Sequence, residues 1–87
     1  MLHELKCEGR HFNAIWQGKK LFEYRLNDRN YLLNDILLLK EYFADNRHYT
    51  GRALSAKVSF ILKSSDGFDS LNEFVIMSLS NVSIVRT

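Results

Sequence analysis

The side chains best suited to chemistry are concentrated between residues 18 and 29, where the chain reads Gly-Lys-Lys-Leu-Phe-Glu-Tyr-Arg-Leu-Asn-Asp-Arg. Glu23 and Arg25 stand two residues apart, so a strand directs both side chains to the same face, and Lys20 precedes them. A carboxylate beside two cations can accept hydrogen bonds from the amine or amide edge of a ligand, while the cations can donate to carbonyl or phosphate oxygens. This pattern favours a nucleobase or nucleotide over an apolar ligand. On spacing alone, a purely structural Glu–Arg pair is the simpler interpretation.

Further residues could contribute to such a site. Tyr49 and Arg52 could place a stacking ring and a phosphate-binding guanidinium beside it, and a turn with incidental charge is the alternative. Asn27 and Arg29 belong to a polar cluster that forms either a turn bonded to its own backbone or the rim of a binding cleft. His3 could act as a hydrogen-bond or proton-transfer partner, or could be a half-exposed strand histidine without such a role.

The sequence does not indicate a metal or cofactor. His11 and His48 show no ligand spacing with Cys7 or with each other, so we expect neither a metal nor a cofactor. Cys7 has no obvious base near it in the sequence and is expected to be a small buried apolar residue. A Gly-rich phosphate loop and a recognisable Ser/His/Asp arrangement are both absent from the sequence.

Periodic hydrophobic patterns predict the elements that position these side chains. Phe12, Ile15 and Trp16 recur at i, i+3 and i+4, which predicts an amphipathic helix. We expect all three side chains to lie in the core. We expect this helix over residues 9–17, with Gly18 just after it as a left-handed cap. Strands are predicted at residues 2–7, 20–26, 35–42 (buried on both faces), 52–62, 74–79 and 82–85, with a polar loop at 44–51 and turns at 66–67 and 80–81.

Many short strands and a single helix near the start are typical of an α+β, mainly β fold, a small barrel of five or six strands with the helix at its mouth. The 87 residues predict a single domain, residues 1–87, because two cores would leave each half too small to fold. A content of 46% hydrophobic and 25% charged residues is that of a globular chain and excludes a disordered one. The net charge of +2 is too small to indicate nucleic-acid binding by itself.

Membrane and secretory functions are not expected. The longest apolar run, residues 36–39, falls far short of the roughly 20 residues that a spanning helix needs. The first residues do not show the basic start, apolar stretch and cleavage site of a secretory signal. The single cysteine excludes an internal disulfide, so we expect a reducing, cytoplasmic location. These patterns set no oligomeric state.

The pattern Gly-x-Lys-x-x-Glu-x-Arg, filled by Gly18, Lys20, Glu23 and Arg25, resembles the ASCH family, and in particular a short subgroup from bacteria and their phages. The resemblance follows the chain in order through the segments His3 to Lys6, Gly18 to Lys20, Phe22 to Arg25, Asn27 to Arg29, Asp35 to Leu37 and Tyr49 to Arg52. It implies a PUA-like fold, a small β-barrel with an N-terminal helix and a cleft between them. It also implies RNA or a nucleotide as the ligand, with Lys20, Glu23 and Arg25 lining the cleft.

Two hypotheses of function follow from the residues and the resemblance. In the first, the chain is a binding module in which Lys20, Glu23 and Arg25 hold a base or a short single-stranded RNA, with Lys19 beside them. In the alternative, it is a small amidohydrolase acting on a modified nucleoside such as N4-acetylcytidine, with Lys20 and Glu23 as the catalytic groups. Some short ASCH relatives look like such enzymes and have a Thr nucleophile where this chain has Glu23. We expect the binding module.

Overall fold

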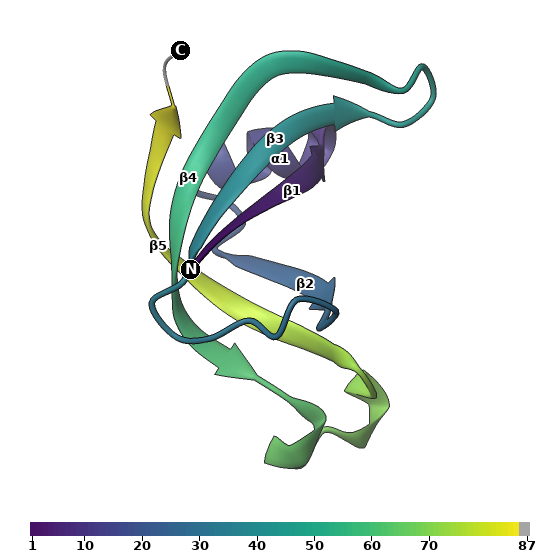
Figure 1. The fold of residues 1–87 in the computed structure, drawn as a ribbon, viewed down its shortest axis with the longest axis vertical. Coiled ribbons are helices and arrows are strands. Elements are labelled where there is room, and N and C mark those ends of the chain that lie inside the picture. Colours follow the sequence, from purple (N-terminus) through teal and green to yellow (C-terminus); the bar gives the residue numbers. More distant parts are fainter. Residues whose placement is uncertain (86–87) are drawn as a thin grey trace.

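The structure, a computed structural model, describes residues 1–85, and Figure 1 shows their arrangement. Strands make up most of the chain, and one α-helix follows the first strand. In chain order the elements are β1 (Leu2–Glu8), α1 (Gly9–Trp16), β2 (Phe22–Leu26), β3 (Ile36–Phe43), β4 (His48–Leu62), the short 3₁₀ helices η1 (Ser64–Asp66) and η2 (Asp69–Leu71), and β5 (Phe74–Val85). The predicted helix is confirmed, and the strands follow one another as predicted, except that the last two predicted strands form the single strand β5.

All five strands belong to one sheet with the order β1-β3-β4-β5-β2. β1 pairs with β3 in parallel, and the other neighbours pair antiparallel. The sheet curves strongly, and β4 and β5 bend through it so that the two edge strands, β1 and β2, come to lie near each other (Figure 1). The prediction of a small, mainly β, barrel-like fold is therefore confirmed in its coarse form. The sheet is a half-barrel, because β1 and β2 are not paired with each other.

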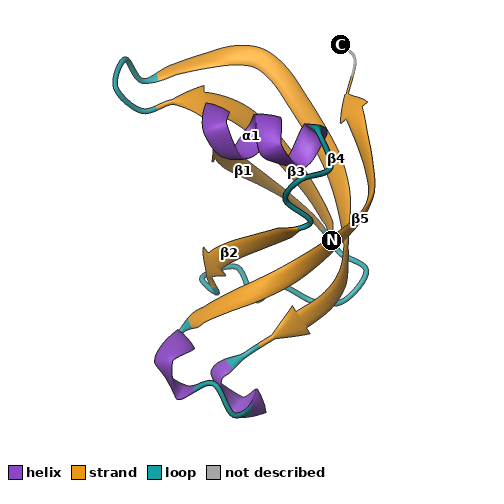
Figure 2. Ribbon diagram, turned by 180° about the vertical axis from the view of Figure 1, so that it is seen from behind, coloured by secondary structure: helices purple, strands orange, loops and turns teal. Residues whose placement is uncertain are grey.

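The core lies on the inner face of the curved sheet, where α1 packs (Figure 2). Phe12 and Ile15 of α1 are buried there, while Trp16 is 46% exposed. The expectation that Trp16 lies in the core is thus wrong, because a helix of two turns over this sheet buries only the narrow stripe that faces it. Gly18 has φ +74°, as expected of a residue that ends a helix in the left-handed conformation.

Strand β3 is buried on one face only, contrary to the expectation from its apolar run. Leu37 and Leu39 are fully buried, whereas Leu38 and Lys40 between and after them are half-buried on the outer face. The predicted loop at 44–51 is also too long, because β4 already begins at His48 and Tyr49 pairs with Tyr42. The connection shrinks to a turn over residues 44–47.

Irregular pairing between β4 and β5 explains two further differences from the sequence prediction. The register shifts between Val58 and Phe60, and Phe60 is 57% exposed, although a strict alternation would place it beside Val58 on the buried face. The predicted turn at 80–81 does not interrupt β5, which continues from Phe74 to Val85 while Asn81 takes φ +52°. Each irregularity changes the local direction of a strand without ending it. Among residues 1–85, no helix has the length and apolar character needed to cross a membrane.

Candidate functional site

Strand β2 carries its charge on the buried side and its apolar side chains on the exposed side. Glu23 is only 3% exposed, whereas Phe22, Tyr24 and Leu26 are 44%, 50% and 42% exposed. The predicted alternation of β2 is confirmed, but its polarity is the reverse of an ordinary half-buried strand. A carboxylate inside a small core costs free energy unless it is fully paired, so Glu23 needs partners that offset this cost.

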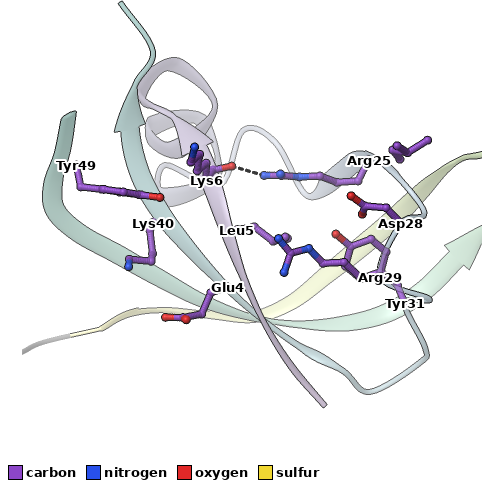
Figure 3. A pocket seen from close by; sticks show the side chains of 10 residues that line it. Glu4, Leu5, Lys6, Arg25, Asp28, Arg29, Tyr31, Lys40 and Tyr49 are labelled. Atoms are coloured by element: carbon purple, nitrogen blue, oxygen red, sulfur yellow. Dashed lines mark hydrogen bonds between the residues drawn. The ribbon is translucent and has the colours of Figure 1, made fainter. Parts of the chain in front are cut away.

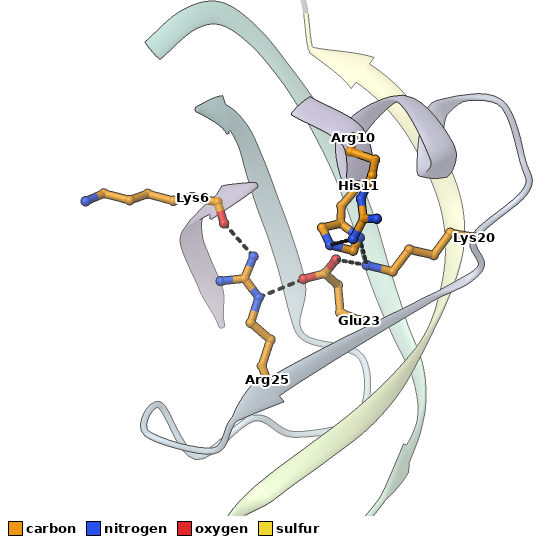
Figure 4. Close-up of polar contacts among 6 residues, drawn as sticks. All are labelled: Lys6, Arg10, His11, Lys20, Glu23 and Arg25. Carbon is orange, nitrogen blue, oxygen red and sulfur yellow. Dashed lines mark hydrogen bonds and ion pairs between the residues drawn. The ribbon is translucent and has the colours of Figure 1, made fainter. Parts of the chain in front are cut away.

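Glu23 is held between two cations, as Figure 4 shows. Arg25 Nε donates to Glu23 Oε2 at 2.7 Å, and Lys20 Nζ lies 3.4 Å from Glu23 Oε1. The three side chains that the spacing singled out are therefore brought together. Lys20 reaches them from the segment that joins α1 to β2, and the partly buried side chains of Lys20 and Arg25 are 15% and 25% exposed.

His11 of α1 completes the group from the opposite side. Lys20 Nζ lies 3.0 Å from His11 Nδ1, whereas Arg10 approaches the other ring nitrogen only to 3.4 Å. An ammonium group can only donate, so Nδ1 is the acceptor in the contact with Lys20. The sequence analysis missed His11, because only the packing of α1 over β2 brings it to Lys20.

These residues line an open cleft of about 630 Å³ between the end of β1, α1 and the free edge of β2. One part of its lining is polar, with Lys20, Glu23, Arg25 and His11. The other part is aromatic and aliphatic: its members are Phe22, Tyr24, Leu26, Phe74 and Ile76. The rings of Tyr24 and Phe74 are stacked with centroids 4.8 Å apart, and Lys20 Nζ lies 5.3 Å from the centre of the Phe22 ring. The cleft thus offers flat apolar surface next to directed hydrogen-bonding groups.

Arg25 also bridges the open side of the half-barrel. Its Nη2 donates to the main-chain carbonyl of Lys6 on β1, while its Nε holds Glu23 (Figure 4). Both strands are sheet edges, so their outward backbone groups have no neighbouring strand to pair with. One guanidinium therefore ties the two edges together at the cleft.

The remaining predicted residues occupy different positions. Lys19 is exposed and does not line the cleft, and Asn27 Oδ1 accepts the Tyr31 amide in a local turn, as the turn interpretation expects. Arg29 and Tyr49 line a neighbouring cavity. Arg52 lies against α1, where it donates to Asn13 and to the buried carboxylate of Glu41. The hydrogen bonds between Arg52 and Glu41 are the largest cause of both pKa shifts: they raise the pKa of Arg52 and lower the pKa of Glu41.

His3 is buried on the inner face of β1, not half-exposed. Its Nε2 lies 2.8 Å from Asp35 Oδ2, and the same carboxylate accepts from the Leu32 amide and from the Met1 ammonium group. The His3 hydrogen bond, followed by those of Leu32 and Met1, outweighs burial and holds the pKa of Asp35 at about 2. Neither His3 nor Asp35 lines the cleft.

Cys7 lines the cleft but is buried, as the sequence analysis expected. Burial is the main cause that raises the pKa of its thiol to about 12, and the charge of Glu23 adds to this effect. A thiol with so high a pKa stays protonated at neutral pH. Among residues 1–85, no three His, Cys, Asp or Glu side chains gather in a way that could hold a metal ion.

The fold and cleft define a small half-barrel domain in which a buried Lys–Glu–Arg group meets an aromatic wall. A family model described as "Domain of unknown function (DUF3850)" matches residues 2–79, and the chain belongs to this family. It is also similar to a protein of Escherichia phage P2 described as "Uncharacterized 12.9 kDa protein in GpA 3'region". The two are 33% identical over 76 residues, which cover 87% of this chain and 65% of the phage protein. The chain thus spans just under two thirds of that relative's length.

Proposed function

We propose that the cleft binds a nucleobase, presented by a nucleotide or by single-stranded RNA. The observation that carries the proposal is the pairing of a buried acid, held between two cations, with exposed aromatic rings in one cleft. A base offers a flat apolar face and a polar edge, and proteins bind unpaired bases by using both. A purely structural ion pair would not need the exposed rings of Phe22, Tyr24 and Phe74 beside it.

The free hydrogen-bonding capacity of the group supports this function. A carboxylate has about four acceptor positions, and the structure uses one oxygen of Glu23 for Arg25 and the other for Lys20. Glu23 can therefore still accept from an amino or imino group of a base. Lys20 and Arg25 retain donors for carbonyl or phosphate oxygens, and the three charges hold one another in place before a ligand arrives.

The proposal extends to the fold relationship and the location. The resemblance to the ASCH family implies a small β-barrel with an N-terminal helix and a cleft between them. The half-barrel sheet, its helix and the cleft support this expectation, and we propose that the fold is PUA-like. The lone, buried Cys7 is compatible with a reducing compartment, and we propose the cytoplasm, where RNA and nucleotides are abundant.

The test is a titration of the protein with the four ribonucleoside monophosphates, in which calorimetry or fluorescence measures binding. Lys20→Ala and Glu23→Gln each remove one member of the charged group, so each should weaken binding by about 1.5–3 kcal/mol, or roughly 10- to 150-fold. Lys19→Ala is the matched control, because it removes the same charge one residue away but outside the cleft. Equal binding by wild type, Lys20→Ala and Glu23→Gln would refute the proposal.

The contact between Lys20 and His11 favours a second candidate, an amidohydrolase acting on a modified nucleoside. Lys20 Nζ lies 3.0 Å from a ring nitrogen that can take a proton, and Glu23 stands beside it as a possible general base toward water. Incubation with N4-acetylcytidine, followed by its ultraviolet spectrum, tests this candidate. Turnover that is lost in His11→Ala and Lys20→Ala and kept in Lys19→Ala would support the enzyme, and no turnover at high protein concentration would exclude this substrate.

A further inference from the structure

A second cavity, of about 490 Å³, opens on the other side of the Arg25 bridge, as Figure 3 shows. Its lining comes from β1, β3, β4 and from β2 with the segment that follows it. The charged and aromatic residues in this lining are Glu4, Lys6, Arg25, Asp28, Arg29, Tyr31, Lys40 and Tyr49. Lys20, Glu23 and His11 do not belong to it, so the cavity is distinct from the cleft.

The second cavity carries positive charge that the protein does not neutralise. Four of its side chains are cations and two are acids. Because Arg25 is already paired with Glu23, three cations face two acids, which leaves a formal charge of +1 in the cavity. Within residues 1–85, Lys6, Arg29 and Lys40 take no part in an ion pair. Unpaired cations that converge on a cavity attract an anionic ligand, and their attraction weakens with salt.

Aromatic rings alternate with these cations on the outer face of the sheet. Lys40 Nζ lies 4.8 Å from the centre of the Tyr49 ring, and Lys6 Nζ lies 4.7 Å from that of Tyr42. The two tyrosine rings are 4.9 Å apart, and Tyr49 is 43% exposed. Rings that can stack on bases, interleaved with ammonium groups that can meet phosphates, are the arrangement by which proteins bind single-stranded nucleic acids.

The two cavities adjoin each other, because Lys6, Arg25 and Leu26 line both. Arg25 has five N–H donors and uses one for Glu23 and one for the Lys6 carbonyl, so donors remain for a ligand that passes over it. A free nucleotide would fill the cleft alone. A chain of nucleotides would cross the Arg25 bridge and also use the unpaired cations and the exposed ring beyond it.

We infer that the ligand is a single-stranded polynucleotide that occupies both cavities. One base lies in the cleft, a phosphate crosses at Arg25, and the next nucleotide lies in the second cavity. There Arg29 and Lys40 hold its phosphate and Tyr49 stacks on its base. This inference rests on the proposed nucleobase function of the cleft and names the class of ligand that the cleft receives.

The experiment compares single-stranded homotetramers of the four ribonucleotides with the corresponding monophosphates, for wild type, Arg29→Ala and Lys40→Ala. We expect the best tetramer to bind wild type at least about tenfold more tightly than its monophosphate. Each variant should lose about fivefold or more on the tetramer, keep its affinity for the monophosphate, and reduce the salt-dependence slope by about 0.7. Lys57→Ala, which removes a charge from β4 outside both cavities, should bind like wild type.

Substitutions at position 49 test the stacking contact separately from charge. Tyr49→Ala should weaken tetramer binding about fivefold or more, whereas Tyr49→Phe keeps the ring and should bind like wild type. Phe68→Ala, which removes another exposed ring outside both cavities, is the matched control. Circular dichroism and thermal unfolding identify any variant that has lost its fold, and binding is compared among folded variants.

The outcomes separate the inference from the proposed function. If monophosphates bind in a Lys20-dependent manner but tetramers bind no more tightly, the second cavity is not a nucleotide site and the inference is overturned while the function of the cleft stands. If neither binds, the proposed function itself fails. Competition by a poly-glutamate peptide as effective as the tetramer would also overturn the inference, because it would show a general anion surface. Parallel titrations with deoxyribonucleotide tetramers decide whether the strand is RNA or DNA, and a Tyr49-dependent gain with either supports the inference.

Discussion

Replacing Arg52 with alanine removes the main partner of a fully buried acid. Glu41 is 2% exposed, and Arg52 donates to both of its oxygens, from Nε at 2.7 Å and from Nη2 at 2.8 Å. Thr50 Oγ1 adds a third hydrogen bond at 2.7 Å, and Arg52 Nη2 also reaches Asn13 of α1. In Arg52→Ala, the carboxylate would keep only the threonine hydroxyl, and α1 would lose a tie to the β3–β4 hairpin.

The expected loss of stability follows from these contacts. Hydrogen bonds to charged groups contribute about 1.5–3 kcal/mol each, and breaking a buried ion pair by removing one partner costs about 3–5 kcal/mol. Arg52 is itself 46% exposed as a side chain, so water would reach Glu41 when Arg52 is truncated and would reduce the penalty. We therefore expect Arg52→Ala to lower the free energy of unfolding by about 2–3 kcal/mol. For a domain of this size that corresponds to a fall in Tm of roughly 10–20 °C.

Urea and thermal unfolding of Arg52→Ala, Glu41→Gln and the double variant measure the effect. The double variant should be less destabilised than the sum of the single ones, because it leaves no buried charge without its partner. Arg10→Ala, at an exposed position of α1, is the matched control and should change stability by no more than about 0.5 kcal/mol.

The pH dependence identifies the buried charge as the cause. Arg52 lowers the pKa of Glu41 below its ordinary 4.5 in the folded protein, so the pair stabilises the fold fully above about pH 4.5. That stabilisation disappears as the pH falls through the lowered pKa and Glu41 takes up a proton. The difference between wild type and Arg52→Ala should therefore be largest near pH 7 and shrink in acid. A loss below about 1 kcal/mol, or a difference that is the same at pH 7 and pH 3, would refute this reasoning.

Three further predictions concern the rest of the molecule. The His3 hydrogen bond is the main cause that lowers the pKa of Asp35 from 3.8 to about 2, which corresponds to about 2.5 kcal/mol of stability. That contribution is complete above about pH 3.8 and is lost as the pH falls through about 2, so Asp35→Asn should flatten the acid limb of the stability curve measured between pH 4 and 2. The buried Cys7 thiol should react with a disulfide reagent at pH 8 only after denaturant is added, and rapid reaction of the native protein would contradict its burial. Trp16→Ala should lower the free energy of unfolding in urea by less than about 1 kcal/mol, whereas Phe12→Ala should lower it by about 3–5 kcal/mol. Equal losses of stability in the two variants would contradict the exposure of Trp16.

Local patterns predicted the elements whose form depends on neighbours in the sequence. The alternation of residues 2–7 and 20–26 and the stripe of Phe12 and Ile15 appear in the structure as β1, β2 and α1, although β2 begins only at Phe22. Gly18 takes the positive φ angle that its position just after a helix requires. These features were predictable because a few adjacent residues determine them.

Features that depend on distant pairing could not be predicted in the same way. Phe60 turns to solvent because of a register shift against β5, and β4 begins early because Tyr49 pairs with Tyr42 across a short turn. The same holds for the candidate site. The spacing of Glu23 and Arg25 was enough to place both on one face, but His11 joins them only through the packing of α1, and Arg52 is directed to Glu41 by the irregular part of β4.

The reversed polarity of β2 is the strongest physical indication that the cleft has a function. A shift of one residue would bury Phe22 and Tyr24 and expose Glu23 and Arg25, which is the arrangement that an edge strand selected only for stability would favour. A buried ion pair rarely stabilises a fold more than apolar side chains of the same size, so the observed register gains little from Glu23 itself. Local choices that oppose the global fold are expected where a protein binds or reacts. Strand β2 departs from the ordinary pattern in two ways, with a buried acid and with exposed aromatic rings, and both line the same cleft. The proposed ligand, a base with a polar edge and a flat face, would account for both the buried acid and the exposed rings.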